Sequence, residues 1–508
     1  MQWHKACLSI LAVGLTLIGC KNTPLEKKPT TELSIGLITG LGGVTEPCGC
    51  TSRPLGGLDR MAGLVSERNA MGAFGLLLVG NTFYELDNPP GHRVQQEHEK
   101  ARAIASVLEN LKPMGILPGQ RDVEVGGQRL QEFAESFRLP VFSGIRGPSK
   151  LRFKADSALR TIGGHKVGII GIAGAEASNQ ADSYTQGALA LRRQGAAMVL
   201  ALVGVGGAEG EALAAKIDGV DIIVLGGEDE VRAPRVIGNS LVVEAGDRGQ
   251  RLGSLTFHMK GTGAFRYYDE GRSQRSALDK RMSRLESALE RMDPGPGREA
   301  RSAKLEELKA QLAAIQTTPP EGRYVTWAID EVSQDTAAQS WATQVLTKYN
   351  KSLCKLTLAA HEDLKCPPVQ SETEEYAGSQ TCRTCHVAAY EVYEKTAHSH
   401  AWKTLQDKGK DCDVGCVGCH SVGFEKPGGY CRLQDVKPFA NVGCENCHGP
   451  AKSHSLAPGD RSQWSTQFVR KPTESTCTGC HNEEHSDQFD YETYLPRVLG
   501  IGHGVPSQ

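Results

Sequence analysis

Short apolar runs, separated by alanine-rich stretches of helical character, recur through the first half of the chain. They occupy residues 33–38, 74–79, 167–172, 198–203, 222–225 and 241–244. Strands of such uniform apolar character are typical of a sheet that is covered on both faces. Their alternation with helices predicts an α/β sandwich over residues 33–260 as the first large unit of a multidomain protein.

The pattern changes between residues 271 and 316, where apolar residues recur at a spacing of three or four. They are Leu278, Met282, Leu285, Leu289 and Met292, followed after a turn by Leu305, Leu308, Leu312 and Ile315. This spacing on both sides of a Pro-Gly-Pro-Gly turn predicts an antiparallel helical hairpin with a coiled-coil seam. We expect a solvated intramolecular hairpin rather than a dimerisation arm.

A connecting segment is predicted over residues 320–370. It contains a strand near 324–329 and a helix near 336–349, and both are expected to pack back on the sandwich. Cys354 and Cys366 lie close together at its end, so a disulfide between them is the simplest interpretation.

The pentapeptide CxxCH occurs four times in the last quarter of the chain. Its thiols are Cys382, Cys385, Cys416, Cys419, Cys444, Cys447, Cys477 and Cys480, and its histidines are His386, His420, His448 and His481. CxxCH is the attachment signal for c-type haem, because two thiols bind one porphyrin and the next residue supplies an axial imidazole. Zinc ribbons are the alternative, but a zinc site needs no histidine after every second cysteine. The sequence therefore predicts four covalently attached haem c groups.

The four signals follow one another too closely for independent folds with one haem each. We therefore predict a single tetrahaem domain over residues 376–508, mostly helical and built around the porphyrins. Cys412 and Cys431 bracket the second signal, and a disulfide between them would hold its loop.

The distal haem ligands can be narrowed by elimination. All eight methionines lie at or before Met292, so the haem domain offers no methionine ligand. Its remaining histidines are His398, His400, His454, His485 and His503. Ligation by two histidines is therefore predicted, which gives lower potentials than ligation by histidine and methionine.

Residues 376–386, 396–401, 416–430 and 442–450 carry a specific resemblance. They are similar to the tetrahaem cytochrome c-554 family and related multihaem cytochromes. The resemblance implies that His398 and His454 are distal ligands and that a third comes from the C-terminal part, either His503 or His485. It also implies a five-coordinate iron on His420, although His400 could fill the sixth position.

Two segments of the first unit, 54–60 and 244–253, resemble the metallophosphatase domain of periplasmic 5′-nucleotidases. The resemblance implies that fold and a site for two metal ions at strand ends. The sequence departs from the family's ligand pattern, because Thr39 replaces an aspartate, Asn81 replaces the bridging aspartate and Arg121 replaces a histidine. Two dications need several anionic or imidazole ligands. We therefore expect a scaffold without metal or catalysis.

The N-terminus has the features of a secretory signal. Lys5 precedes an apolar run from Ala6 to Ile18, and Gly19 and Cys20 follow this run. This ending resembles the lipobox of bacterial lipoproteins, with an ordinary signal peptide as the alternative. We expect residues 1–20 to form a lipoprotein signal peptide that is cleaved before Cys20, so that Cys20 becomes the lipidated first residue of the mature protein. Residue 21 is a lysine rather than an aspartate, which in such lipoproteins indicates the outer membrane.

One further cysteine pair, Cys48 and Cys50, has two interpretations. It is either a redox-active dithiol or a metal or ligand contact that faces the pocket beside the former metal positions, or a pair of loop thiols that form disulfides elsewhere or with each other.

Charge limits the range of functions. Lys and Arg number 57 and Asp and Glu number 59, so no nucleic-acid partner is indicated. We expect electron transfer in the cell envelope of a bacterium, facing the periplasm, with redox proteins or quinol-linked donors as partners. The alternatives are a haem- or thiol-based reductase or oxidase of a small nitrogen or sulfur compound, and an active nucleotidase fused to a cytochrome.

Overall fold

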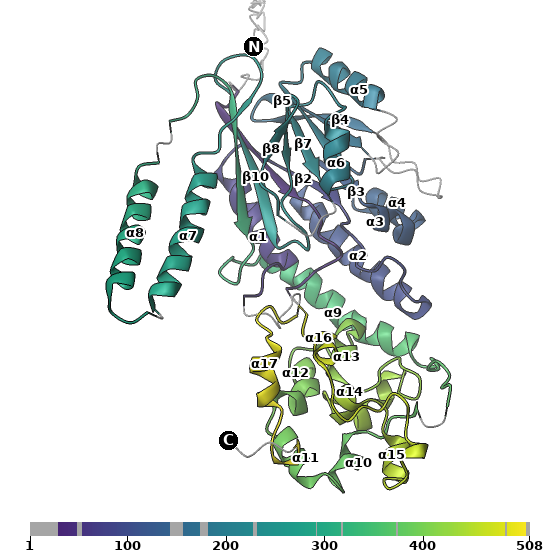
Figure 1. The fold of residues 1–508 in the computed structure, drawn as a ribbon. Coiled ribbons are helices and arrows are strands. Elements are labelled where there is room, and N and C mark those ends of the chain that lie inside the picture. Colours follow the sequence, from purple (N-terminus) through teal and green to yellow (C-terminus); the bar gives the residue numbers. More distant parts are fainter. Residues whose placement is uncertain are drawn as a thin grey trace, which may run out of the picture.

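A computed structural model gives the fold (Figure 1). It describes residues 29–47, 53–142, 156–172, 181–226, 231–290, 292–315, 318–371, 374–482 and 485–503. The predicted leader 1–20 with Cys20, and the pair Cys48 and Cys50, lie outside the described residues.

The first half of the chain forms two six-stranded sheets. The first sheet has the order β11-β12-β10-β1-β2-β3 and comprises β1 (Glu32–Ile38), β2 (Phe74–Gly80), β3 (Gly115–Pro118), β10 (Arg251–His258), β11 (Arg266–Tyr267) and β12 (Tyr324–Glu331). The second has the order β4-β5-β6-β7-β9-β8 and comprises β4 (Ser157–Ile162), β5 (His165–Ile172), β6 (Met198–Val203), β7 (Ile222–Leu225), β8 (Arg235–Ile237) and β9 (Ser240–Val243). All six apolar runs are strands, which confirms the predicted α/β sandwich.

The sheets pack face to face, and helices cover both outer faces. Side chains such as Ile35, Leu200 and Trp327 fill the space between the sheets. Helices α1 (Leu58–Met71), α2 (Gly91–Leu111), α4 (Gln128–Ser136) and α9 (Ser340–Ala360) bury apolar residues on the first sheet. Helices α5 (Ala181–Arg193) and α6 (Gly207–Ala214) do so on the second sheet. The short α3 (Gln120–Gly126) follows β3.

The segment 320–370 completes the sandwich rather than only connecting two units. Strand β12 lies between β10 and β11, antiparallel to β10. Helix α9 is longer than predicted; it packs on α1 and α2 and then continues to the C-terminal region (Figure 1). The predicted hairpin corresponds to α7 (Arg272–Glu290) and α8 (Pro296–Ala313), which stand side by side and away from the sheets (Figure 1).

The C-terminal region consists of short helices joined by turns. They are α10 (Ser379–Arg383), α11 (Val387–Tyr393), α12 (Ala401–Asp407), α13 (Val414–His420), α14 (Cys444–His448), α15 (Lys452–Leu456), α16 (Glu474–Thr478) and α17 (Tyr491–Tyr494). Its apolar cluster is small and centres on Val417, Phe424 and Tyr430. Across the described ranges, no helix combines the length and the apolar character that crossing a bilayer requires.

Two disulfides link α9 and the segment after it to the C-terminal region, and they correct the predicted pairing. Cys354 pairs with Cys412 and Cys366 with Cys431, at Cα–Cα distances of 4.8 and 5.3 Å. The predictions of Cys354 with Cys366 and of Cys412 with Cys431 were wrong, because they relied on closeness in sequence. Cys354 is held on the rigid helix α9, whose end lies against the loop around the second CxxCH signal.

Candidate functional site

Each CxxCH signal lies at least partly on a short helix: the second and third lie within α13 and α14, and the first and fourth begin in α10 and α16 and include the turn that follows. The turn is closed by backbone bonds such as His386 N–H to the Cys382 carbonyl and His481 N–H to the Cys477 carbonyl, each 2.9 Å. Because residues three apart share one helix face, the two thiols of a signal project in the same direction. The histidine directly follows the second cysteine, so its ring lies near the iron of a porphyrin that these two thiols would attach.

The signals also meet one another. The side chain of Cys382 lies next to that of Cys444, and the side chain of Cys419 lies next to that of Cys480. Cys447 and Cys477 lie within electrostatic reach of each other. The first signal therefore adjoins the third, the third adjoins the fourth, and the fourth adjoins the second. All four converge on one shared interior.

Two pairs of histidines face each other across this interior. The ring centres of His386 and His454 lie 6.1 Å apart, and those of His398 and His481 also lie 6.1 Å apart. A metal ion held between two imidazoles needs two bonds of about 2 Å, which separates the ring centres by roughly 6 Å. Each pair therefore has the spacing that one iron ion, ligated from both sides, requires.

Hydrogen bonds set the orientation of the histidine rings of the other two CxxCH signals. Nδ1 of His420 lies 2.7 Å from the Ala401 carbonyl oxygen, and Nδ1 of His448 lies 2.9 Å from that of Val469. Since a carbonyl oxygen only accepts, Nδ1 is the protonated nitrogen in each ring. This leaves Nε2 with its lone pair available for iron, as in other metal-binding histidines.

The surroundings of the paired rings favour the neutral imidazole that binds iron. Burial lowers the pKa of His398 and His454, and the nearby His481 and His386 lower these pKa values further. Burial also lowers the pKa of His481. Trp464 packs edge-on against His454 with ring centres 4.3 Å apart, which restricts the orientation of that ring.

The other candidate ligands differ from one another. Burial lowers the pKa of His503, and His448 and His386 lower it further, so His503 lies near two proximal histidines. His400 is exposed, and its Nδ1 lies 3.4 Å from Ser399 Oγ. His485 follows the fourth signal, where its backbone N–H donates to Oδ1 of Asn482.

His420 differs from the two paired proximal histidines. Among the ring contacts of the described residues, none joins His420 or His448 to another imidazole, although His448 lowers the pKa of His503. His420 instead lies at the end of α13, next to the region that the Cys354–Cys412 disulfide holds against α9.

Sequence reasoning missed the role of Glu445, which lies inside the third signal. Glu445 is 3% exposed, and its carboxylate accepts from the backbone N–H groups of Ala377, Gly378 and Ala451, each at 2.8 Å. Burial raises the pKa of Glu445, while these three donors oppose the rise. Glu445 thus holds the backbone just before the first signal, at Ala377 and Gly378, against the helix of the third signal. An acidic residue within CxxCH was the available clue.

The former metal positions of the α/β unit serve as internal hydrogen-bond partners. Oδ1 of Asn81 accepts from the Arg121 N–H at 3.1 Å. Asp122 is fully buried and accepts from the N–H groups of Thr82, Phe83 and Tyr84. Within the described part of this unit, these oxygens hold loops together.

Comparison with known proteins agrees with the site geometry. Residues 381–449 match the family model described as cytochrome c554 and c-prime. Cytochrome c-554 from Nitrosomonas europaea is 34% identical over 182 residues, which cover 28% of this chain and 76% of that protein. The chain belongs to the cytochrome c-554 family. As a cytochrome c-554 relative it is a c-type cytochrome with covalently bound haem c, and its long N-terminal α/β unit lies outside residues 381–449, which the family model matches.

This cytochrome c-554 family member is also similar to solved nucleotidase structures. The 5′-nucleotidase precursor from Thermus thermophilus has a TM-score of 0.45 at 16% identity, covering 74% of this chain and 68% of that chain. The Haemophilus influenzae NAD nucleotidase has a TM-score of 0.45 at 14% identity, covering 69% of this chain and 64% of that chain. The present chain thus spans less than two thirds of the latter protein.

Proposed function

We propose that this protein is an electron carrier of the bacterial cell envelope that binds four haem c groups within residues 376–508. The two histidine pairs with ring centres 6.1 Å apart carry this proposal. Haem iron, when bound, supplies one-electron chemistry by alternating between its ferric and ferrous states. Imidazoles on both sides of an iron leave no position for a substrate, which favours electron transfer over catalysis.

The roles of the histidines follow from their positions. His386, His420, His448 and His481 are the proximal ligands, since each follows its pair of thiols. His454 is the distal partner of His386, and His398 that of His481. We assign His503 to His448, because these two lie within electrostatic reach. His485 and His400 remain alternative candidates for distal ligands.

Substitution of a distal histidine by methionine tests these roles. His454→Met and His398→Met should each raise the reduction potential of one haem, because methionine ligation raises the potential. His165→Met is the control, since His165 lies in strand β5 of the α/β unit with its ring bonded to the Thr30 carbonyl oxygen, and it should leave all potentials unchanged. Potentials are read by spectroelectrochemistry. Unchanged potentials in both His454→Met and His398→Met would contradict the proposed ligation.

A second candidate function is reduction or oxidation of a small nitrogen or sulfur compound. It is favoured by His420, which among the described residues has no ring contact with another imidazole, whereas His448, which also lacks such a ring contact, lowers the pKa of the nearby His503. Carbon monoxide distinguishes the two functions, because it binds ferrous haem only at an open position. Binding at one haem per chain supports the enzyme, whereas a reduced protein that binds none supports a pure carrier.

For the α/β unit we propose a structural role without nucleotidase activity. Asn81, Arg121 and Asp122 are occupied by hydrogen bonds within the unit, and Asn81 provides only a neutral oxygen. Nucleoside monophosphate incubated with the protein and Mn²⁺ should release no phosphate. Release that a chelator abolishes would show that the unit is an active phosphatase.

We further propose that Cys20 anchors the protein to the outer membrane by a lipid. Its partners are then redox proteins or quinol-linked donors of the periplasm. Fractionation of membranes from wild type and Cys20→Ser tests the anchor, and release of the variant into the soluble fraction is expected.

A further inference from the structure

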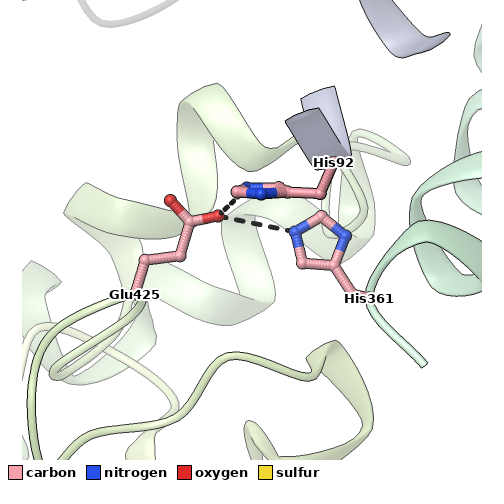
Figure 2. Close-up of side chains that lie close together, drawn as sticks. All are labelled: His92, His361 and Glu425. Carbon is pink, nitrogen blue, oxygen red and sulfur yellow. Dashed lines mark hydrogen bonds and ion pairs between the residues drawn. The ribbon is translucent and has the colours of Figure 1, made fainter. Parts of the chain in front are cut away.

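Three segments that are far apart in sequence bring His92, His361 and Glu425 together (Figure 2). His92 lies in the first turn of α2, His361 directly follows α9, and Glu425 lies in the turn after the second CxxCH signal. One ligand atom from each lies within 4.8 Å of the others. Among the described residues, this is the one group of three or more metal-ligating side chains at such distances.

Both imidazoles point at the same oxygen of Glu425 (Figure 2). Nε2 of His92 lies 2.7 Å from Oε1, and Nε2 of His361 lies 3.5 Å from it. The other oxygen, Oε2, accepts from Nη2 of Arg93 at 2.9 Å. The carboxylate is therefore oriented by Arg93, with one oxygen directed at the two rings.

The protonation of His361 makes this arrangement informative. His361 is 1% exposed, and its Nδ1 lies 2.8 Å from the Thr357 carbonyl oxygen. Because that oxygen only accepts, Nδ1 carries a proton, so Nε2 is the ring nitrogen that faces the carboxylate. Nε2 lies 3.5 Å from Oε1 of Glu425, which is longer than an ordinary charge-assisted hydrogen bond. A buried nitrogen that faces an anionic oxygen at this distance needs a cation between them, either a second ring proton or a metal ion.

We propose that His92, His361 and Glu425 bind one divalent transition-metal ion of the zinc class. Bonds of about 2.0–2.1 Å in tetrahedral geometry separate ligand atoms by about 3.3 Å. The 3.5 Å separation at His361 fits this value, while the 2.7 Å contact of His92 must lengthen by roughly half an ångström. Water would fill the fourth position.

The surroundings agree with such an ion. A metal-binding histidine usually donates its other ring nitrogen to a carbonyl, and a metal-binding carboxylate is usually hydrogen bonded as well. Thr357 and Arg93 meet these two requirements. The ion would join the α/β unit to the turn after the second haem signal, alongside the two disulfides.

Zinc content measures the proposal directly. The haem-loaded full-length protein is treated with a chelator, dialysed against Zn²⁺ and then against buffer, and its zinc is counted per chain by elemental analysis. Wild type should hold one zinc ion more than His92→Gln or Glu425→Gln. Zinc should raise the unfolding temperature of wild type and leave that of both variants unchanged.

His98→Gln is the matched control, because His98 lies on the same helix but contacts Tyr84 rather than this group. It should retain the zinc ion. If a variant fails to fold, zinc X-ray absorption of wild type still decides, with nitrogen and oxygen neighbours at about 2.0–2.1 Å expected. Equal zinc content in wild type and Glu425→Gln would overturn the proposal. So would a wild type that binds no zinc, in which case the cation beside His361 is a proton.

Discussion

The two halves of this protein differ in how much of their interior consists of apolar side chains. The α/β unit has apolar clusters between its sheets and on both outer faces, built from its own side chains. The C-terminal region has one small cluster around Val417, Phe424 and Tyr430, and surrounds it with cysteines and histidines. An interior that buries little apolar surface gains little stability from the hydrophobic effect. The C-terminal region must therefore depend on what its cysteines and histidines bind.

Removal of haem should produce the largest difference in folding between the two regions. When the protein is produced without haem attachment, we expect residues 376–508 to remain unfolded while the α/β unit folds. Limited proteolysis should then digest the C-terminal region and leave a resistant fragment that contains the two sheets. A C-terminal region that resists protease equally with and without haem would show that it forms its own core.

A cavity introduced into the α/β core should have the next largest effect, a loss of stability confined to that unit. Ile104 on α2 is fully buried against the first sheet. Ile104→Ala should lower the free energy of unfolding by about 2–5 kcal/mol, because it removes packed methyl groups and leaves a cavity. The haem absorption spectrum should not change. Met71→Ala is the control at an exposed site, and chemical denaturation should show a change within about 0.5 kcal/mol.

Loss of one disulfide tests the link between the halves. Cys354 and Cys412 are 58 residues apart, so their bond restricts a long loop of the unfolded chain. Cys354→Ser combined with Cys412→Ser should cost about 2–4 kcal/mol of stability. Calorimetry should also resolve two unfolding transitions more clearly than in wild type. The pair Cys366→Ser and Cys431→Ser should behave in the same way, whereas a single unchanged transition would contradict this link.

The smallest expected effect is a pH dependence of stability that arises from a buried carboxylate of the α/β unit. Burial raises the pKa of Asp122 to about 6, although the N–H groups of Thr82, Phe83 and Tyr84 oppose this rise. The unfolded value is about 3.9. The folded state thus binds the proton more tightly, so this contribution to stability is complete below about pH 4 and is lost as the pH rises through about 6. Asp122→Asn should remove this slope from the unfolding temperature.

The sequence predicted much of the fold because its strands are apolar without interruption. Strand β10 was missed, since Ser254, Thr256 and His258 interrupt its apolar pattern. The disulfide partners could not be derived, because they depend on where α9 ends in space. His92, His361 and Glu425 are separated by most of the chain, so nothing local marks them as one group.

For the haem region, the proposed proximal ligands follow from the CxxCH rule, since each histidine adjoins its cysteines. The distal positions His398 and His454 came only from resemblance to a family, and the structure places them opposite His481 and His386. Glu445 went unnoticed because a CxxCH rule ignores the two intervening residues. Its role appears only where Ala377, Gly378 and Ala451 converge on its carboxylate.

The mass of the intact mature protein, purified from its native envelope and measured under denaturing conditions, tests the central claim most directly. Thioether bonds survive denaturation, so we expect the polypeptide mass to be increased by four haem groups. A polypeptide that carries no haem would contradict the claim that residues 376–508 are a c-type cytochrome.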